Sequence, residues 1–410
     1  MRVALIGPLP PELGGATPGG VATHQAYLAS VLAAEPDLDV SLLATNAAAL
    51  APLPFCAWPM RVPGGVRGWL DPRYLRRVGG ARAARYAARL ARTKAAGSRR
   101  ERLASLLWYR HFLSEARPDV VHVQHPLERL STTQEVARVE RRRWPLVVTA
   151  HSLFGEHAED VIHGFMAPNL RTADRVIAVS PHIADQAAQL GVDRARIRVI
   201  RSGIDTEHYR PGNRPAARLR LGITAEAPLA LFVGNLEPRK QVAVLLHAMA
   251  TIRESAPEAR LAIVGSGDER ERLQRLAAEL RLADAVCFVG RVEPAALLDW
   301  YAAADVFALP SSSEAQGIVA LEAMACGLPV VASAVGGLHG TIEDGQSGYL
   351  VPSGEVEPLA QRLTALLCDG ALRASIGTAA RERVTREFSW ARTVQATVNV
   401  YRELVPCATR

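Results

Sequence analysis

Two carboxylates, separated by seven residues, flank the expected start of a helix. Glu314 and Glu322 lie in the segment SSSEAQGIVALEAMACGLPVVASAVGG, which follows a strand-like run. We expect the helix to begin near Gly317 and to end at Gly327. A helix N-terminus offers unpaired N–H groups and a positive dipole end, so it attracts anions. One interpretation is that both carboxylates hold ligand hydroxyls; the other is that Glu314 is a first-turn acid and Glu322 an exposed helix residue.

A lysine stands out in a chain that otherwise uses arginine. Of the 48 Lys and Arg residues only Lys94 and Lys240 are lysine, and Lys240 follows the strand-like run LALFVGN. Lysine is a compact point charge that can reach a phosphate from a loop. Gly336 and Gly337 follow a further strand at the same end of the expected sheet, where glycine lets the backbone approach a ligand. His151 also ends a strand-like run, in VVTAHSLFG.

Short apolar runs alternate with longer helical segments along the whole chain. Such an alternation predicts parallel sheets that are covered by helices on both faces. A polar segment with prolines, GIDTEHYRPGNRPAARLRLGITAEAP, interrupts it near Asp205. We therefore expect an α/β protein of two doubly wound, Rossmann-type domains with a ligand cleft between them. Six strands are expected before the interruption (VALIG, DVSLLAT, DVVHVQ, PLVVTAH, DRVIAVS, RIRVIRSG) and six after it (LALFVGN, RLAIVGSG, AVCFVG, DVFALPS, LPVVAS, GYLVP).

The bulk composition agrees with a globular protein of two domains. The chain has 410 residues, of which 49% are hydrophobic and 22% charged, and one core rarely supports this length. Five scattered cysteines without a CxxC pair favour a reducing cytoplasm over a disulfide framework or a zinc site. The first apolar run, Val3 to Ile6, is too short for a signal peptide. We expect no metal site and no resident cofactor.

The positive charge of the chain is concentrated in one segment. Residues 61–110 carry fourteen Lys or Arg and two acids, a net +12, so the other residues sum to −5. We read this segment as a basic helical insertion, helical from Tyr74 to Arg92. Three interpretations stay open: contact with an anionic membrane surface, an acidic or phosphorylated acceptor, or a solvated helical face. Nucleic acid is not expected, because aromatic residues are not interleaved with the basic ones.

The order and spacing of these segments resemble the retaining glycosyltransferases of family four, which have the GT-B fold. The resemblance includes the E-x7-E pattern with AMACGLPVVAS, the loop VGNLEPRKQ, the segment AIVGSGDERERLQRLAAEL and, near the N-terminus, GGVATHQAYLASVLA. It covers nearly the whole chain and is weakest from about Ala51 to Glu115. It implies an N-terminal acceptor-binding domain (residues 1–205), a nucleotide-sugar-binding domain (206–389) and a C-terminal helix (390–410) that packs back on the first domain.

The resemblance implies roles for three residues in the reaction. By motif position, Lys240 contacts the donor diphosphate, where a cation stabilises the charge that builds on the leaving group. Glu314 holds hydroxyls of the donor sugar. His151 faces the cleft from the N-terminal domain. His122 and His125, in HVQHP, are assigned a structural role, although a strand end can also place one of them near an acceptor.

The same resemblance implies a set of donor-binding residues. Glu322 holds the ribose, and the backbone N–H groups at the start of its helix lie near the sugar or diphosphate. The family usually has an arginine where this chain has Asn235, and the neighbouring Arg239 is the candidate to replace it. The complete set is Gly19, Gly20, Asn235, Arg239, Gly317, Ile318, Val319 and Glu322.

The expected function is transfer of a hexose from a nucleotide-sugar, with retention of configuration and without a metal. A UDP-sugar is favoured, and GDP- and ADP-sugars stay open. The acceptor is unidentified and is lipid-linked, a small molecule or a saccharide. The location is cytoplasmic, with peripheral attachment to the inner face of the membrane as an option. Two alternatives are a nicotinamide-dependent oxidoreductase and a non-catalytic sugar-nucleotide-binding module. The oxidoreductase would need a GxGxxG loop, and the first loop of this chain, GPLPPELGGATPGG, does not match that pattern.

Overall fold

The chain folds into two compact units. The structure is a computed structural model that describes residues 1–13, 20–47, 50–60, 99–125, 128–154 and 161–405. The first unit is Met1–Ile200 with Thr393–Arg410, and the second is Arg201–Arg392. The sequence placed the corresponding boundaries at residues 205 and 389.

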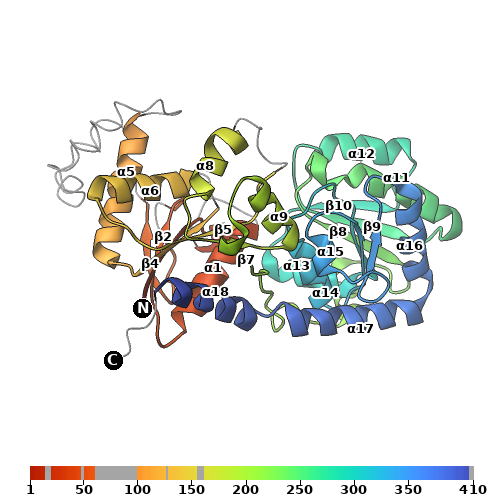
Figure 1. The fold of residues 1–410 in the computed structure, drawn as a ribbon. Coiled ribbons are helices and arrows are strands. Elements are labelled where there is room, and N and C mark those ends of the chain that lie inside the picture. The colour runs from red at the N-terminus through yellow and green to blue at the C-terminus, as the bar shows by residue number, and fades with distance from the viewer. Residues whose placement is uncertain (14–19, 48–49, 61–98, 126–127, 155–160, 406–410) are drawn as a thin grey trace. The chain divides into compact units, whose positions relative to one another are not determined.

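The first unit is built on a parallel sheet of seven strands in the order β3-β2-β1-β4-β5-β6-β7. In Figure 1, α5, α6 and α8 lie on one side of this sheet and α18 lies on the other. The elements are β1 (Arg2–Gly7), η1 (Pro11–Leu13), α1 (Gly20–Ala33), β2 (Asp39–Ala44), β3 (Cys56–Pro59), α5 (Arg99–Ala116), β4 (Val120–Gln124), α6 (Glu128–Glu140), β5 (Leu146–Ala150), η2 (Ile162–Met166), α8 (Ala167–Leu170), β6 (Arg175–Ala178), α9 (Pro181–Gln189), η3 (Arg194–Arg196), β7 (Ile197–Val199) and α18 (Trp390–Leu404).

Six of these seven strands follow from the apolar runs in the sequence. The central strands β4 and β5 are buried throughout, as expected of a parallel sheet with helices on both faces. The seventh strand, β3, was missed because it is short, contains Pro59 and is only partly buried at the edge of the sheet. Helix α9 has a serine cap: the side chain of Ser180 accepts a hydrogen bond from the N–H of Ile183.

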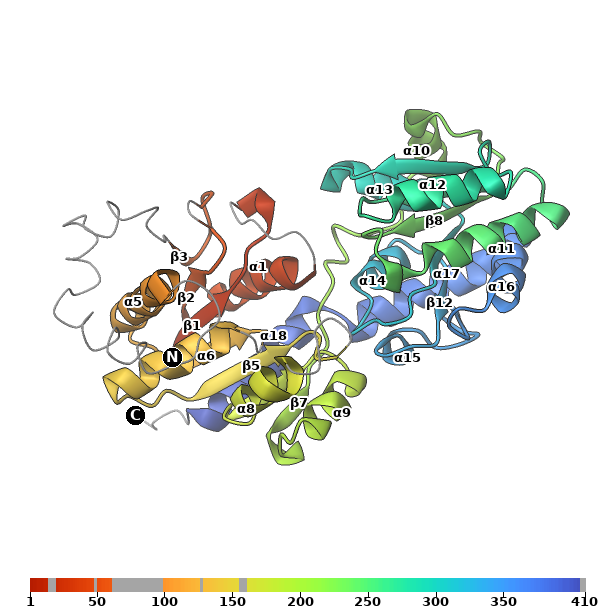
Figure 2. The same ribbon diagram turned by 90° about the horizontal axis from the view of Figure 1, so that it is seen from above.

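The second unit is built on a parallel sheet of six strands in the order β10-β9-β8-β11-β12-β13. All six expected strands are present, and helices pack in pairs around them: α11 with α16, α10 with α13, and α14 with α17 (Figure 2). The elements are α10 (Arg214–Leu221), β8 (Leu229–Val233), η4 (Pro238–Lys240), α11 (Val242–Ser255), β9 (Arg260–Val264), α12 (Arg270–Glu279), β10 (Val286–Gly290), α13 (Pro294–Ala303), β11 (Val306–Leu309), α14 (Ile318–Ala325), β12 (Val330–Ser333), α15 (Leu338–Thr341), β13 (Tyr349–Val351), α16 (Val356–Cys368) and α17 (Gly370–Glu387).

In each sheet the strand order reverses direction at one place, which we call the switch point. In the first sheet the reversal lies between β1 and β4, and in the second it lies between β8 and β11. Loops leave the carboxyl ends of two adjacent strands in opposite directions there, which opens a crevice that binds ligands in doubly wound proteins. The loops after β1 and β4, and those after β8 and β11, are therefore candidate sites. The sequence alone did not give this strand order.

The basic segment is described only in part. Residues 61–98 and the helix expected from Tyr74 to Arg92 lie outside the described residues. In the described remainder, arginines of α5 pair with acids of α6: Arg102 with Glu135 at 3.3 Å and Arg110 with Glu140 at 3.1 Å. Within the described chain, no helix is both long enough and apolar enough to cross a membrane.

Candidate active site

The switch point of the second sheet brings together the two loops that carry the chemistry-bearing residues. The loop after β8 runs from Gly234 to Lys240, and the loop after β11 runs from Pro310 to Gly317. One backbone hydrogen bond joins the two loops: the N–H of Ser312 donates to the carbonyl of Arg239 at 2.8 Å. This main-chain contact holds the ends of the two loops together.

Lys240 and Glu314 form a buried ion pair at this point. The Nζ atom of Lys240 lies 2.5 Å from Oε1 of Glu314, and the hydroxyl of Ser311 donates to the same oxygen at 2.8 Å. Lys240 is 8% exposed and Glu314 is 9% exposed. Oε2 of Glu314 makes no hydrogen bond to any described residue. An ammonium group carries three N–H donors, so Lys240 keeps two for a ligand.

Helix α14 presents its N-terminus beside this pair. Its first turn leaves the N–H groups of Ile318 and Val319 without intrahelical acceptors, which makes the helix start suitable for an anion. Gly317 caps the helix with φ 77°, and a Cβ there would lie 2.6 Å from Cδ2 of Leu338. Only glycine satisfies both the left-handed conformation and the close packing at this position.

The close approach that requires glycine at Gly337 is to the backbone of its own unit. A Cβ at Gly337 would lie 1.9 Å from the carbonyl oxygen of Ala315, and the N–H of Gly337 donates to the carbonyl of Glu314 at 2.9 Å. The glycine therefore lets α15 pack against the backbone of the Glu314 loop. This packing supports the loop that carries Glu314.

Glu322 occupies a separate polar environment inside α14. Its Oε2 accepts a hydrogen bond from the hydroxyl of Tyr301 at 2.7 Å. Burial raises the pKa of Glu322 to about 7, although hydrogen bonds from Tyr301 and Tyr209 oppose this shift. Glu322 is thus neither an exposed helix residue nor a partner of Lys240, and near neutral pH it exists in both protonation states.

Asn235 and Arg239 are both held by Glu237, a residue for which the sequence predicted no role. The side-chain amide of Asn235 donates to Oε1 of Glu237 at 3.1 Å, and Nε of Arg239 donates to Oε2 at 2.9 Å. Arg239 and Glu237 are both about one-third exposed. Glu237 therefore offsets the charge of Arg239, while the nearby Lys240 is paired with a different carboxylate. The acid that precedes two basic residues in NLEPRK was the available signal for this arrangement.

In the first unit, His151 lies directly after β5 in a buried polar cluster. Its Nε2 donates to Oε1 of Gln124 at 2.8 Å, and its ring contacts His24 edge-on with centroids 4.7 Å apart. Burial, together with the neighbouring histidines, holds the pKa of His151 well below its usual value, and burial lowers that of His24 to about 4. Both imidazoles are neutral near pH 7. Gly20 starts α1, and Gly19 lies outside the described residues.

Behind His151, the C-terminal helix contributes to the same cluster. His122 has Nδ1 at 2.6 Å from Oη of Tyr401 and Nε2 at 2.7 Å from Oγ1 of Thr149. Burial lowers the pKa of His122 to about 3. Because His122 is enclosed by these partners, it stabilises the packing of α18 within the first unit. Tyr401 could not be found from the sequence, since 279 residues separate it from His122.

The described residues contain no group of three or more His, Cys, Asp or Glu side chains arranged to hold a metal ion. The structure thus brings Lys240, Glu314 and the start of α14 together in the second unit. It brings His151, His24 and Gln124 together in the first.

Comparisons with known proteins agree with this architecture. The family model "Glycosyltransferase Family 4" matches residues 18–208, and "Glycosyl transferases group 1" matches residues 213–383. D-inositol 3-phosphate glycosyltransferases of Saccharomonospora viridis and Acidothermus cellulolyticus are each 38% identical to this chain. The first match covers 70% of both chains, and the second covers 70% of this chain and 67% of the relative.

Solved structures match over almost the full length. Sucrose-phosphate synthase of Thermosynechococcus elongatus superimposes with a TM-score of 0.78 at 27% identity, and covers 98% of each chain. HepE of Anabaena, solved with UDP and glucose, gives a TM-score of 0.71 at 21% identity, and covers 98% of this chain and 100% of its own.

Two parallel sheets, each covered by helices and each with its own switch point, define a glycosyltransferase of the GT-B class. The chain belongs to glycosyltransferase family 4, whose members retain the anomeric configuration. The expected fold and enzyme class are confirmed, and the oxidoreductase and non-catalytic alternatives are wrong.

Proposed function

We propose that the enzyme transfers a hexose from a UDP-sugar to a hydroxyl of a phosphorylated cyclitol. The relatives at 38% identity are named for D-inositol 3-phosphate, which supports an acceptor of this class. GDP- and ADP-sugars are the other candidate donors. Among solved proteins of this fold, HepE has been crystallised with UDP-glucose, so UDP-glucose is the first donor to test.

The buried Lys240–Glu314 pair is the observation that carries this proposal. During transfer, the bond between the anomeric carbon and the diphosphate oxygen breaks, and the electron pair leaves with the diphosphate. The ammonium group of Lys240 lies at the switch point, where it stabilises that negative charge. Oε2 of Glu314 accepts a hydrogen bond from a donor-sugar hydroxyl. Since the two side chains are bonded to each other, they fix the sugar relative to its leaving group.

The remaining expected residues bind the donor around this pair. The N–H groups of Ile318 and Val319 meet the diphosphate or sugar, and Glu322 binds the ribose. Gly317 shapes the loop between them, and Gly19 and Gly20 bring backbone close to the phosphates. Asn235 and Arg239 lie beside the diphosphate. His151 contributes a neutral hydrogen-bonding ring, so it contacts a sugar hydroxyl without adding charge.

The acceptor hydroxyl attacks the anomeric carbon on the face from which the diphosphate departs. Its oxygen forms the new bond to that carbon, and its proton passes to the departing phosphate oxygen. UDP and the glycosylated acceptor are the products. This step requires no covalent link between sugar and protein and no metal. The five scattered cysteines, which include no CxxC pair, support a cytoplasmic location. We assign residues 61–110, which carry a net charge of +12, to the binding of an anionic acceptor or membrane.

A donor screen followed by product analysis tests this function. UDP-, GDP- and ADP-linked glucose, galactose and mannose are compared by the rise in melting temperature, which reports binding to the folded state. The best donor is then incubated with D-inositol 3-phosphate, and proton NMR of the anomeric position reports the configuration. We expect a UDP-hexose to bind and an α-linked product to form from an α-linked donor. No thermal response to any donor, or an inverted product, would contradict the proposal.

A further inference from the structure

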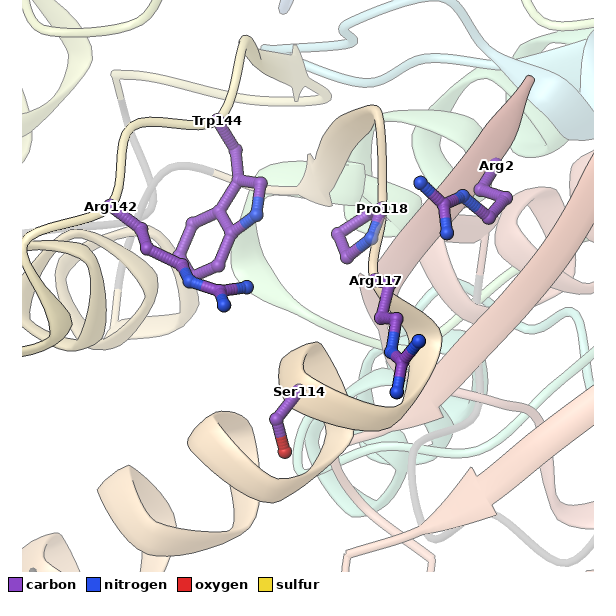
Figure 3. A pocket seen from close by; sticks show the side chains of 6 residues that line it. All are labelled: Arg2, Ser114, Arg117, Pro118, Arg142 and Trp144. Atoms are coloured by element: carbon purple, nitrogen blue, oxygen red, sulfur yellow. The ribbon is translucent and has the colours of Figure 1, made fainter.

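A polar cavity lies in the first unit, at the opposite edge of the sheet from His151. It has a volume of about 490 Å³ and is lined by Arg2, Ser114, Arg117, Pro118, Arg142 and Trp144 (Figure 3). This volume is within the range of about 300–1,000 Å³ found for small-molecule sites. Three of the six lining residues are arginines, and none is acidic.

Within the first unit, the cavity lies far from the His151 cluster. Arg2 begins β1, Pro118 precedes β4, and Trp144 precedes β5, so the cavity lies at the amino ends of the strands. His151 follows the carboxyl end of β5. At about 3.3 Å per residue, Trp144 and His151 are about 23 Å apart along this strand. A ligand in the cavity therefore does not reach the His151 cluster.

Two of the three arginines have no acidic partner. Arg2 pairs with Asp119 at 3.0 Å. In the part of the chain that the structure describes, the guanidinium groups of Arg117 and Arg142 form neither an ion pair nor a hydrogen bond. Their neighbour Arg143, in contrast, pairs with Asp174 at 3.2 Å. The pairing of nearby arginines shows that acids are available at this edge of the sheet, yet none faces the cavity.

The charge balance of the cavity favours an anion. Helices α5 and α6 end at its rim, and each C-terminus contributes about half a negative charge. Arg117 and Arg142 contribute two full positive charges, which outweigh the two helix ends. The hydroxyl of Ser114 donates its one proton to the carbonyl of His111 at 2.8 Å, so it is not counted among the groups that bind the anion. Pro118 and Trp144 add an apolar wall.

We propose that this cavity binds the phosphoryl group of a phosphate monoester, with Arg117 and Arg142 as its ligands. Guanidinium groups present forked N–H donors that match the geometry of phosphate oxygens. The organic part of the ester lies against Trp144 and Pro118. The ester is a second ligand of the enzyme, distinct from the nucleotide-sugar and from the acceptor.

Phenyl phosphate is the probe for this site, because it joins a phosphoryl group to a flat ring. The indole N–H signal of Trp144, assigned with Trp144→Phe, reports binding in a two-dimensional NMR spectrum of the full chain. We expect a saturable shift of this signal. Arg117→Gln and Arg142→Gln each raise the Kd by about tenfold, since each removes a charge-assisted hydrogen bond. Arg143→Gln, which makes the same change beside the cavity, alters the Kd by less than about twofold.

A second arm identifies the source of the phosphoryl group. The chain is sedimented with vesicles of phosphatidylcholine, with and without phosphatidic acid, a lipid whose headgroup is a phosphate monoester. Binding to phosphatidic acid vesicles that is lost in Arg117→Gln and Arg142→Gln but kept in Arg143→Gln assigns the site to a lipid headgroup. A saturable response to phenyl phosphate alone assigns it to a soluble ester.

Three outcomes overturn the proposal. The first is no response to either probe. The second is an equal loss of binding in Arg143→Gln, which would show that only general surface charge is at work. The third is loss of the Trp144 shift in Lys240→Met, which would place the phosphate at the donor site.

Discussion

Replacing Lys240 by methionine keeps most of the apolar stem of the side chain and removes the ammonium group. In the folded protein the variant leaves Glu314, which is 9% exposed, with the hydroxyl of Ser311 as its side-chain donor. The loss of one partner from a buried ion pair costs about 3–5 kcal/mol. Because Ser311 still donates to Glu314, we expect a loss of about 3 kcal/mol in the free energy of unfolding of the second unit.

The melting temperature provides the measurement of this loss. For a unit of this size, about 1 kcal/mol corresponds to about 2–4 °C, so the transition should fall by about 6–12 °C. Adding Glu314→Gln to the lysine variant removes the unpaired carboxylate. We expect the double variant to recover most of the lost stability, since neither partner remains as a buried unpaired charge.

Activity should respond differently from stability. If Lys240 stabilises the departing diphosphate, Lys240→Met lowers kcat/KM by about 10²–10³-fold, as the loss of one preorganised donor does elsewhere. The double variant should recover stability without recovering activity. Arg239→Gln is the matched control: Arg239 is about one-third exposed and paired with Glu237, so its loss should cost less than about 1 kcal/mol. A folded Lys240→Met enzyme with kcat/KM within about threefold of wild type would refute the reasoning.

Three further substitutions test other parts of the account. The pKa of Glu322 rises from an ordinary 4.5 to about 7 on folding, so between these values the folded state binds more protons than the unfolded state. The contribution of Glu322 to the free energy of unfolding should therefore fall as the pH rises from about 4.5 to 7, while the buried histidines of the first unit act in the opposite sense. Denaturant titrations should show that wild type loses stability relative to Glu322→Gln over this range. Tyr401→Phe should lower the free energy of unfolding by about 1–3 kcal/mol, because it leaves a buried nitrogen of His122 without its partner; an unchanged urea midpoint would contradict this. Gly317→Ala introduces a methyl group 2.6 Å from Leu338 at a φ of 77°, so calorimetry should show both a lower melting temperature and weaker UDP binding.

The sequence predicted the parallel strands well because their signal is local. Each buried strand is a short apolar run bounded by turn residues, and twelve such runs became strands. Strand β3 lacks that signal, since it pairs only at the sheet edge and is partly exposed. The order of the strands, which makes β8 and β11 neighbours, depends on non-local pairing that no run of residues encodes.

Part of the candidate site could likewise be predicted from the sequence, and part could not. Lys240 and Glu314 were singled out because each follows a strand, but their ion pair depends on the strand order. Ser311 and Glu237 were missed because a serine or an acid in a polar loop is unremarkable until its partner is known. Gly337 was correctly seen as a position that needs glycine, but the close contact is with the backbone of its own unit.

In the proposed reaction, Lys240 contacts the donor diphosphate. Titration calorimetry of wild type and Lys240→Met with UDP and UMP tests this contact, because the two nucleotides differ only by the β-phosphate. We expect wild type to bind UDP at least about tenfold more tightly than UMP, since a charge-assisted contact to phosphate is lost with UMP. In Lys240→Met the two affinities should become nearly equal. The same UDP-to-UMP ratio in both proteins would contradict the claim.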